Sequence, residues 1–416
     1  MPEVELKYGR SRIALSLDQD RFEVLETSTR PEALTDIELG SRLDHPIDSS
    51  SLEDTVRPGE TVLFVVTDAT RQTACGQVIN LMVRRLIANG TAPHEMSVIF
   101  ATGIHRPVTA GEKTGILTPF IAQRIKTLDH GARDLMQIIH VGETSDGIRI
   151  ELNRALTEHD HIVLIGGVTF HYFAGFTGGR KLVCPGLASA RTVSATHKLA
   201  FDCERRDRRQ GVGNGLLDGN AVHEAFVDAA SKIKPSFSVN TIVNDAGEAV
   251  DLFCGHWNTS HRAACDAYAA RNTIPIDEKR GLVIASCGGF PYDINLIQAH
   301  KALEAASHAC IEGGTIILLA ECAEGAGRND FLDWFSAKSS SEMAERLCEN
   351  YRVNGQTAWS LLRMAERFRV RIVTDLNETE TKTMRVEKID PGSVRELSRN
   401  ATGYILPFGA RSRILV

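Results

Sequence analysis

The sequence predicts an α/β protein made of two α/β domains, with the active site in the cleft between them. Apolar runs of strand length, such as Thr61–Thr67 and His161–Ile165, alternate with amphipathic segments of helical length, such as Gln77–Ile87. Glycine-rich loops join strand to helix at two distant places, after Ile165 and after Ser286. Open α/β sheets bind their ligands at loops of this kind, so each domain is expected to offer a ligand loop.

Composition sets broad limits on the kind of protein. The 416 residues are enough for two domains with separate cores, and the hydrophobic share of 43% and charged share of 24% are typical of globular proteins. The net charge of −6 argues against nucleic-acid binding. Neither a signal peptide nor an apolar run of the ~18 residues needed to span a bilayer is visible, so we expect no membrane partner. The nine cysteines include no Cys-x-x-Cys pair, which predicts neither a disulfide framework nor a structural zinc site and favours a cytoplasmic location.

The N-terminal part carries the first candidate ligand contacts. Residues 1–56 are expected to form short strands and turns without chemistry of their own. The buried strand Thr61–Thr67 then ends in Asp68-Ala-Thr-Arg71, and polar groups at the C-terminal end of a parallel strand are candidate ligand contacts. The alternative for Asp68 and Arg71 is a local ion pair that caps the following helix, which is expected to stop at Gly90.

The same pattern repeats in the next segment. The strand Met96–Ala101 is followed by the loop Thr102–Thr109, in which His105 occupies the position of a catalytic group. The loop ends in Thr109-Ala-Gly-Glu112, which has the form of a capping box. A lone histidine is usually structural, but this one lies in a second strand-end loop beside an arginine. Strands at 137–141 and 148–152 lead on to His161–Ile165.

The chain is organised around the loop Gly166–Gly186 and the helix predicted after it at Ser189–Ala200. Glycines let backbone N–H groups approach an anion closely. The basic side chains of the loop and helix include His171, Arg180, Lys181 and His197. Neither the Gly-Lys-Ser/Thr order of a Walker loop nor a regular G-x-G-x-x-G is present. The alternative is a generic phosphate-binding turn with incidental histidines.

Beyond this loop, most features have a structural interpretation. The basic run Arg205–Arg209 and the glycines of 211–215 are typical of a solvated surface or a lid. A helix is expected at 221–230, and strands at 237–243 and 248–253 flank the hairpin signal Asn244-Asp-Ala-Gly. Cys254 and His256 could form half of a metal site, but no second pair accompanies them, so a structural role is favoured.

A second α/β domain follows the polar stretch at 271–280. We therefore divide the chain into an N-terminal domain, 1–272, with the cofactor loop and catalytic histidines, and a C-terminal domain, 273–416, with substrate contacts. The strand at 281–286 enters Cys287-Gly-Gly-Phe-Pro-Tyr-Asp293 and then a helix on which Gln298 and Lys301 share one face. Strands at 315–320, 371–374 and 404–407 and helices near 330–349 and 356–368 complete this domain.

Five motifs, taken in order, resemble the nickel-pincer lactate racemase family over nearly the whole chain. They are Asp68-Ala-Thr-Arg71, Ala101-Thr-Gly-Ile-His-Arg-Pro107, His171 with Gly178–Gly186, His197, and Gly288–Asp293 with Gln298 and Lys301. The resemblance implies a nickel-pincer nucleotide, nickel pyridinium-3,5-bisthiocarboxylic acid mononucleotide, as cofactor. Because that cofactor supplies a carbon and two sulfurs to the metal, a protein metal cage is not required.

The resemblance also implies a role for each residue. His105 and His171 are the two acid/base groups on opposite sides of the substrate, and histidine titrates close to working pH. His197 is the protein ligand to nickel, a metal that imidazole suits. The implied cofactor contacts are Asp68, Gly178, Gly179, Lys181 and Pro185, with Lys181 either joined to the thiocarbonyl arm or touching it. The implied substrate contacts, to a carboxylate, are Arg71, Gln298 and Lys301.

One position departs from the family pattern. Lactate racemases carry a tyrosine immediately before the glutamine, where this chain has Ile297, and we therefore expect lactate to be a poor substrate. Trp359 either lines the pocket or packs within its helix.

The resulting hypothesis is a racemase or 2-epimerase that moves a hydride reversibly through a 2-keto acid. The alternatives are a nicotinamide-dependent 2-hydroxy acid dehydrogenase and a non-catalytic carrier of a nucleotide cofactor. A dehydrogenase needs a coenzyme fingerprint that is poor here, and a carrier does not need both His105 and His171. The expected partner is a small 2-hydroxy acid, and the question of a homo-oligomer stays open.

Overall fold

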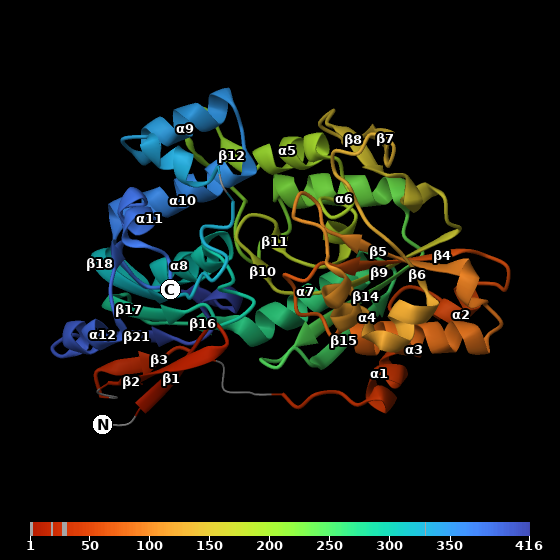
Figure 1. Cartoon of the computed structure of the whole chain (residues 1–416), viewed down its shortest axis with the longest axis horizontal. Coiled ribbons are helices and arrows are strands. Elements are labelled where there is room, and N and C mark those ends of the chain that lie inside the picture. The colour runs from red at the N-terminus through yellow and green to blue at the C-terminus, as the bar shows by residue number, and fades with distance from the viewer. Residues whose placement is uncertain (1–2, 18–19, 27–30, 329) are drawn as a thin grey trace. The chain divides into compact units, whose positions relative to one another are not determined.

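The computed structural model describes residues 3–17, 20–26, 31–328 and 330–416. The chain divides into two compact units, both mixed α/β (Figure 1). Unit 1 comprises Met1–Thr29, Phe201–Arg209 and Ala269–Val416, and unit 2 comprises Arg30–Ala200 and Gln210–Tyr268. The division expected from the sequence, at 272/273, differs because the N-terminal segment and the short segment at 201–209 group with the C-terminal part.

Unit 2 is built on a six-stranded sheet in the order β15-β14-β9-β4-β5-β6. All neighbours are parallel except β14 and β15, which form the hairpin predicted around Asn244. The strands are β4 (Val62–Thr67), β5 (Met96–Ala101), β6 (Lys126–Leu128), β9 (His161–Gly167), β14 (Phe237–Val243) and β15 (Ala249–Gly255). Every residue of β9 except the first is buried, as expected for a strand covered on both faces.

Helices cover one face of this sheet and the glycine-rich loop lies on the other. Four helices share a core with the strands: α1 (Asp36–Leu43), α2 (Leu52–Thr55), α3 (Cys75–Ala88) and α4 (Ala110–Arg124). The loop's one-turn helix η3 (Gly179–Leu182) contacts β4, β9, β14 and α6 (Ala221–Ile233). Smaller elements of unit 2 are the paired strands β7 (Ile138–Glu143) and β8 (Arg149–Asn153), the two-residue strands β10 (Phe170–His171) and β11 (Gly175–Phe176), and helix α5 (Ala190–Lys198).

Parallel pairing in unit 2 determines where its candidate residues meet. Strands β5, β4 and β9 are neighbours and run in the same direction. The loops that begin at Asp68, Thr102 and Val168 therefore leave the sheet at the same edge. This edge is where open α/β sheets bind ligands, and it carries the three candidate loops of the N-terminal part.

Unit 1 contains a second six-stranded sheet, in the order β20-β19-β18-β17-β21-β3, and all its neighbours are parallel. The strands are β3 (Phe22–Val24), β17 (Arg280–Ser286), β18 (Cys310–Leu319), β19 (Arg369–Val373), β20 (Glu387–Lys388) and β21 (Gly403–Leu406). Val283 and Ala285 face a core shared with α8 (Leu296–Ala309), α9 (Ser340–Glu349) and α10 (Val353–Arg367). Leu282 and Ile284 face the opposite core, which β1 (Glu3–Tyr8), β2 (Ser11–Ser16) and α12 (Pro391–Ser398) complete. This alternation follows from the two-residue repeat of a strand.

The first 56 residues differ from the sequence expectation of strands and turns alone. Helix α1 begins after Thr35, whose side chain accepts from the Glu38 backbone while the Glu38 carboxylate accepts from the Thr35 backbone. This capping box was present in the sequence as Thr-x-x-Glu. The strand β3 also pairs in parallel with β21 from the other end of the chain.

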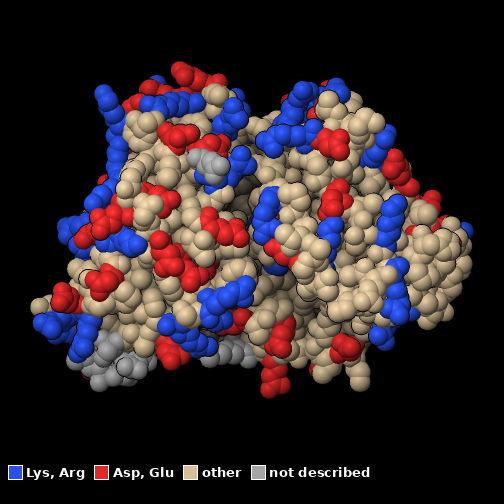
Figure 2. Space-filling model, viewed as in Figure 1, with Lys and Arg blue, Asp and Glu red and all other residues tan. Residues whose placement is uncertain are grey.

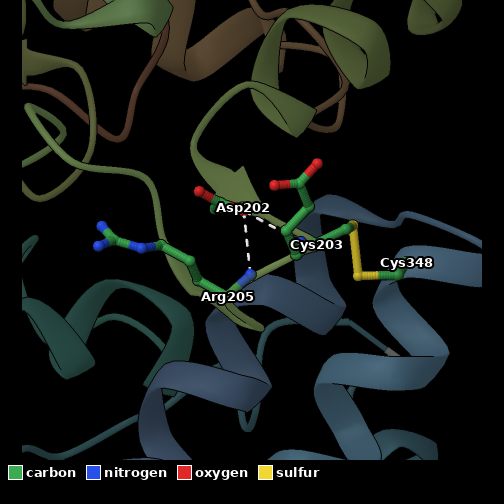
Figure 3. Close-up of a disulfide and its surroundings, with 5 residues drawn as sticks. Asp202, Cys203, Arg205 and Cys348 are labelled. Atoms are coloured by element: carbon green, nitrogen blue, oxygen red, sulfur yellow. Dashed lines mark hydrogen bonds between the residues drawn. A yellow bond between two sulfur atoms is a disulfide. The ribbon is translucent and has the colours of Figure 1, made fainter.

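One disulfide is present, although the cysteine spacing predicted no disulfide framework. Cys203 is bonded to Cys348 on α9, and both belong to unit 1 (Figure 3). Cys203 follows β12 (Phe201–Asp202), and Asp202 shapes the turn after it by accepting from the backbone N–H groups of Glu204 and Arg205. The two cysteines are 145 residues apart, so no local spacing in the sequence indicated the pair.

The distribution of charged side chains on the surface is consistent with the small net charge of −6. Lys and Arg side chains are interspersed with Asp and Glu over the face seen in Figure 2, and neither sign forms a continuous field there. None of the helices among the described residues combines the length and the apolar character that crossing a bilayer requires.

Candidate active site

The first part of the site is a hydrogen bond between Asp68 and His105, in the loops that follow β4 and β5. The Asp68 Oδ2 atom lies 2.7 Å from His105 Nδ1, and the side chains are 8% and 44% exposed respectively. Burial by itself favours the neutral acid, but the neighbouring His105 outweighs it, helped by Arg71 and Thr70, and the pKa of Asp68 falls to about 2. The carboxylate therefore stays charged and holds the Nδ1 proton of His105, which leaves Nε2 as the nitrogen that can exchange a proton.

The alternative role for Asp68 and Arg71, a cap on the following helix, is wrong. Helix α3 begins after Ala74, which has a left-handed backbone and gives no side-chain cap. The Asp68 carboxylate instead accepts from the backbone and hydroxyl of Thr70 and from His105. Asp68 thus orients the histidine of the neighbouring loop.

Glycines allow the central loop to pack tightly against the sheet. Gly186 leaves no room for a side chain, because a Cβ there would lie 2.4 Å from the Leu182 carbonyl oxygen and 2.7 Å from the Ala101 Cβ. The Gly186 carbonyl accepts from the Gly103 N–H at 2.8 Å. This hydrogen bond fixes the His105 loop beside the glycine-rich loop, as the shared edge of parallel strands predicts.

The second part of the site gathers three basic side chains around Phe173. His171 and His197 both meet the Phe173 ring edge-on, with centroids 4.4 and 5.0 Å away. The Lys181 Nζ atom lies 5.6 Å from the same ring and 3.4 Å from His171 Nε2. The Ala174 N–H donates to His171 Nδ1 at 3.3 Å. The structure therefore brings His171, Lys181 and His197 together.

His197 has the properties of a metal ligand. Its Nδ1 donates to the Val193 carbonyl oxygen at 2.8 Å within α5. Burial, and then the charge of Lys181, lower the pKa of His197 to about 3, so its ring is neutral. A neutral ring with Nδ1 held in this way presents an unprotonated Nε2 to a metal. No group of three or more His, Cys, Asp or Glu suited to a metal occurs within the described parts of the chain, so a metal on His197 would need ligands from another source.

The predicted substrate contacts Gln298 and Lys301 lie in unit 1, as do Ile297 and Trp359. On α8, Lys301 Nζ donates to Gln298 Oε1 at 2.5 Å, as their shared helix face predicted. Ile297 packs against the apolar core of this unit. Trp359 is buried and meets Phe201 edge-on at 5.0 Å, which supports the packing interpretation.

Cys254 has the structural role that the sequence favoured. It is buried and donates to the Arg42 carbonyl oxygen.

Two histidines that no sequence motif marks, His223 and His261, contact the buried Arg180. They come from α6 and from α7 (Thr259–Asn272), far from the loop in the sequence.

Because several histidines are buried, we expect acid to destabilise the protein. Burial lowers the pKa of each of them from 6.5: to about 4 for His130 and His300, to about 3 for His197 and His223, and further for His261. Between these values and pH 6.5 the unfolded chain binds more protons, so the free energy of unfolding should fall as the pH drops below 6.5, by about 1.4 kcal/mol per pH unit for each histidine. Urea unfolding between pH 7.5 and 4.5 measures this. In His130→Gln the free energy of unfolding should fall less steeply with pH, by the contribution of one histidine. A free energy of unfolding that stays constant down to pH 4.5 would contradict the prediction.

Known proteins resemble this chain in both sequence and structure. Residues 8–208 match the lactate racemase N-terminal domain family, and residues 276–396 match the lactate racemase C-terminal domain family. The lactate racemases of Thermoanaerobacterium thermosaccharolyticum and Lactiplantibacillus plantarum are 28% and 29% identical over 342 and 336 residues. Both alignments cover 80% of this chain, with 78% and 77% of the relatives. The lactate racemase apoprotein structure from the first organism superposes with a TM-score of 0.89 at 26% identity, covering both chains fully. A Thermotoga maritima protein, 18% identical with a TM-score of 0.71 over 93% of this chain, shares the fold.

Proposed function

Because the chain belongs to the lactate racemase family and is therefore an isomerase, we propose that it is a racemase or 2-epimerase of a 2-hydroxy acid. The observation that carries the proposal is the pair of histidines on different loops at one edge of the unit 2 sheet. His105 is oriented by Asp68, and His171 lies beside Lys181. A carrier would not need two such groups, and a dehydrogenase would need a net oxidant.

The two histidines are assigned to the substrate hydroxyl group. In one direction His105 Nε2 takes the hydroxyl proton while the C2 hydrogen leaves as a hydride, and a 2-keto acid forms. In the second half-reaction the hydride returns to the opposite face and His171 donates a proton to the oxygen. No net oxidation results. Asp68 stabilises the charged form of His105 that each cycle requires.

The residues around Phe173 fit a nickel-pincer nucleotide. His197 presents a neutral Nε2, and Lys181 places an amine close to His171. We propose that His197 binds the nickel and that Lys181, Asp68, Gly178, Gly179 and Pro185 hold the rest of the group. When bound, the group supplies the hydride acceptor and donor that protein side chains lack.

Arg71, Gln298 and Lys301 are proposed to bind the substrate carboxylate, for which a guanidinium offers two parallel donors. The relatives are named for lactate, so lactate is the first substrate to test. Ile297 still predicts that a larger or differently polar 2-hydroxy acid reacts better than lactate, because an aliphatic side chain cannot hydrogen-bond the substrate as tyrosine would.

Racemisation in deuterated water tests the mechanism. Histidines that exchange only the hydroxyl proton leave the C2 hydrogen out of contact with solvent, so inverted product should keep its original hydrogen at C2. A substrate deuterated at C2 should react more slowly and pass its label to the product. The measurement is mass spectrometry of single enantiomers after chiral separation. Rapid uptake of solvent deuterium at C2 would instead assign His105 and His171 to proton abstraction from carbon.

A further inference from the structure

Arg180 is a charged side chain that the proposed chemistry does not use. It is 1% exposed and lies next to Lys181 in the glycine-rich loop. Burial lowers the pKa of its guanidinium to about 10, which leaves it charged at neutral pH. No carboxylate among the described residues forms an ion pair with it, so its partners are carbonyl oxygens and imidazoles. Such a burial is costly, and the contacts that compensate it are specific.

The guanidinium connects the loop to two helices. Its Nη2 donates to the Ala174 carbonyl oxygen at 2.8 Å. Its Nη1 lies 3.5 Å from the Thr177 carbonyl oxygen and 3.4 Å from the Gly178 carbonyl oxygen. Its Nε donates to His223 Nδ1 on α6 at 3.0 Å. Arg180 is thus a single residue through which three loop carbonyls are joined to α6.

His261 on α7 completes the arrangement. Its Nε2 lies 2.9 Å from both the Thr177 carbonyl oxygen and Arg180 Nη1, and one ring nitrogen can serve only one of these at a time. In both cases the ring contacts the loop, and the Gly179 backbone packs directly on it, since a Cβ there would lie 2.6 Å from ring atoms. Both imidazoles are neutral at neutral pH, because burial and then the Arg180 charge lower their pKa values.

These contacts reach the proposed catalytic group through one residue. Arg180 holds the carbonyl of Ala174, and the N–H of the same Ala174 donates to His171 Nδ1. His171 and Gly175 pair across the short β10–β11 ladder. A shift of the loop at Ala174 would therefore move His171 relative to Lys181.

We propose that Arg180 is a positioning residue, which clamps the carbonyls of Ala174, Thr177 and Gly178 to His223 and His261 and thereby sets His171 and Lys181 without touching the substrate. The importance of His171 and Lys181 rests on the proposed function, whereas the clamp itself consists only of contacts between residues of this chain. A lysine at position 180 keeps the charge but has three donors in place of five, so it cannot make all these contacts.

Hydrogen exchange of the cofactor-free protein tests the clamp. In Arg180→Lys the amides of residues 174–183 should exchange at least tenfold faster, while those of β4, β5 and β9 keep their protection. Arg191→Lys, at a side chain that is 79% exposed, is the control and should match the wild type. Unchanged exchange in the loop overturns the proposal. Loss of protection throughout unit 2 also overturns it, because that result assigns Arg180 a general structural role.

Two substitutions of similar size at His223 test the clamp independently, in case Arg180→Lys does not fold. Asparagine places its Oδ1 where histidine has Nδ1, so His223→Asn keeps the acceptor for Arg180, whereas the similarly sized His223→Leu removes it. Loop exchange should rise in His223→Leu and return toward the wild-type rate in His223→Asn. In cofactor-loaded enzyme, His223→Leu should lower kcat at least fivefold with little change in KM, and His223→Asn should restore it. Equal behaviour of the two variants overturns the proposal. If the variants change loop exchange as expected but the wild-type protein does not racemise any 2-hydroxy acid, the result counts against the proposed function and not against the clamp.

Discussion

Replacing His171 by alanine is expected to lower kcat for racemisation by about 10²–10⁴-fold, the range typical of a lost general acid or base. His105→Ala should cause a loss of the same order. Each proposed half-reaction needs a histidine at the substrate hydroxyl, and neither the Asp68 carboxylate nor the Lys181 amine stands at the position of the missing ring. Chiral chromatography of product from each enantiomer measures the effect.

The pattern among variants is as informative as the loss itself. Both variants should retain the bound cofactor, because neither histidine is its metal ligand. One of them is expected to complete a single half-reaction from one enantiomer and to accumulate the 2-keto acid. His140→Ala, at an exposed histidine of β7, is the control and should behave as the wild type. Racemisation at more than half the wild-type rate in His171→Ala or His105→Ala would refute the acid/base assignment.

Replacing His197 by alanine is expected to weaken nickel retention by about 100-fold or more, since even residues outside the ligand shell typically cost 10–100-fold. The neutral ring with Nδ1 held by the Val193 carbonyl is the only imidazole assigned to the metal. The protein should be made in cells that also produce the nickel-pincer nucleotide, desalted, and assayed for nickel per chain.

Two controls separate loss of the ligand from general damage. His130→Asn removes another buried neutral histidine of unit 2, which accepts from Asn153 and contacts the Ala188 carbonyl oxygen, and it should keep its nickel. Wild-type protein from cells without cofactor biosynthesis should be essentially nickel-free. Stoichiometric nickel in that protein, bound at cysteine, would refute the assignment of His197.

The sequence predicted where several candidate residues lie in the fold, in the places where local order decides geometry. Strands followed by polar loops imply a common edge when the strands are parallel, and this logic is enough to place Asp68, His105 and His171 at one edge of the sheet. The hairpin around Asn244 and the capping box at Thr109 are likewise local signals, and both are confirmed. Thr35 and Glu38 carry the same kind of signal, so helix α1 was predictable from the sequence although strands and turns were expected there.

What could not be predicted depends on segments that meet only in the folded chain. The partners of Arg180 come from α6 and α7, and nothing near His223 or His261 in the sequence indicates a guanidinium. The bond between Cys203 and Cys348 and the pairing of β3 with β21 also join distant segments. Roles of individual residues, such as Gln298 and Lys301 at a carboxylate, stay predictions.

The segment order of the two units has a consequence for synthesis on the ribosome. The chain begins in unit 1, enters unit 2, returns to unit 1 for Phe201–Arg209, and visits unit 2 again before it ends in unit 1. Unit 2 can complete its sheet once Gly255 has emerged, whereas β3 must wait for Gly403–Leu406 to find its partner. The β3 segment therefore stays without its partner strand for most of translation, and incompletely folded segments of this kind favour aggregation. A C-terminal fragment of residues 273–416 would lack β3 and Cys203, the partner of Cys348. We therefore expect that this fragment does not fold as an independent domain.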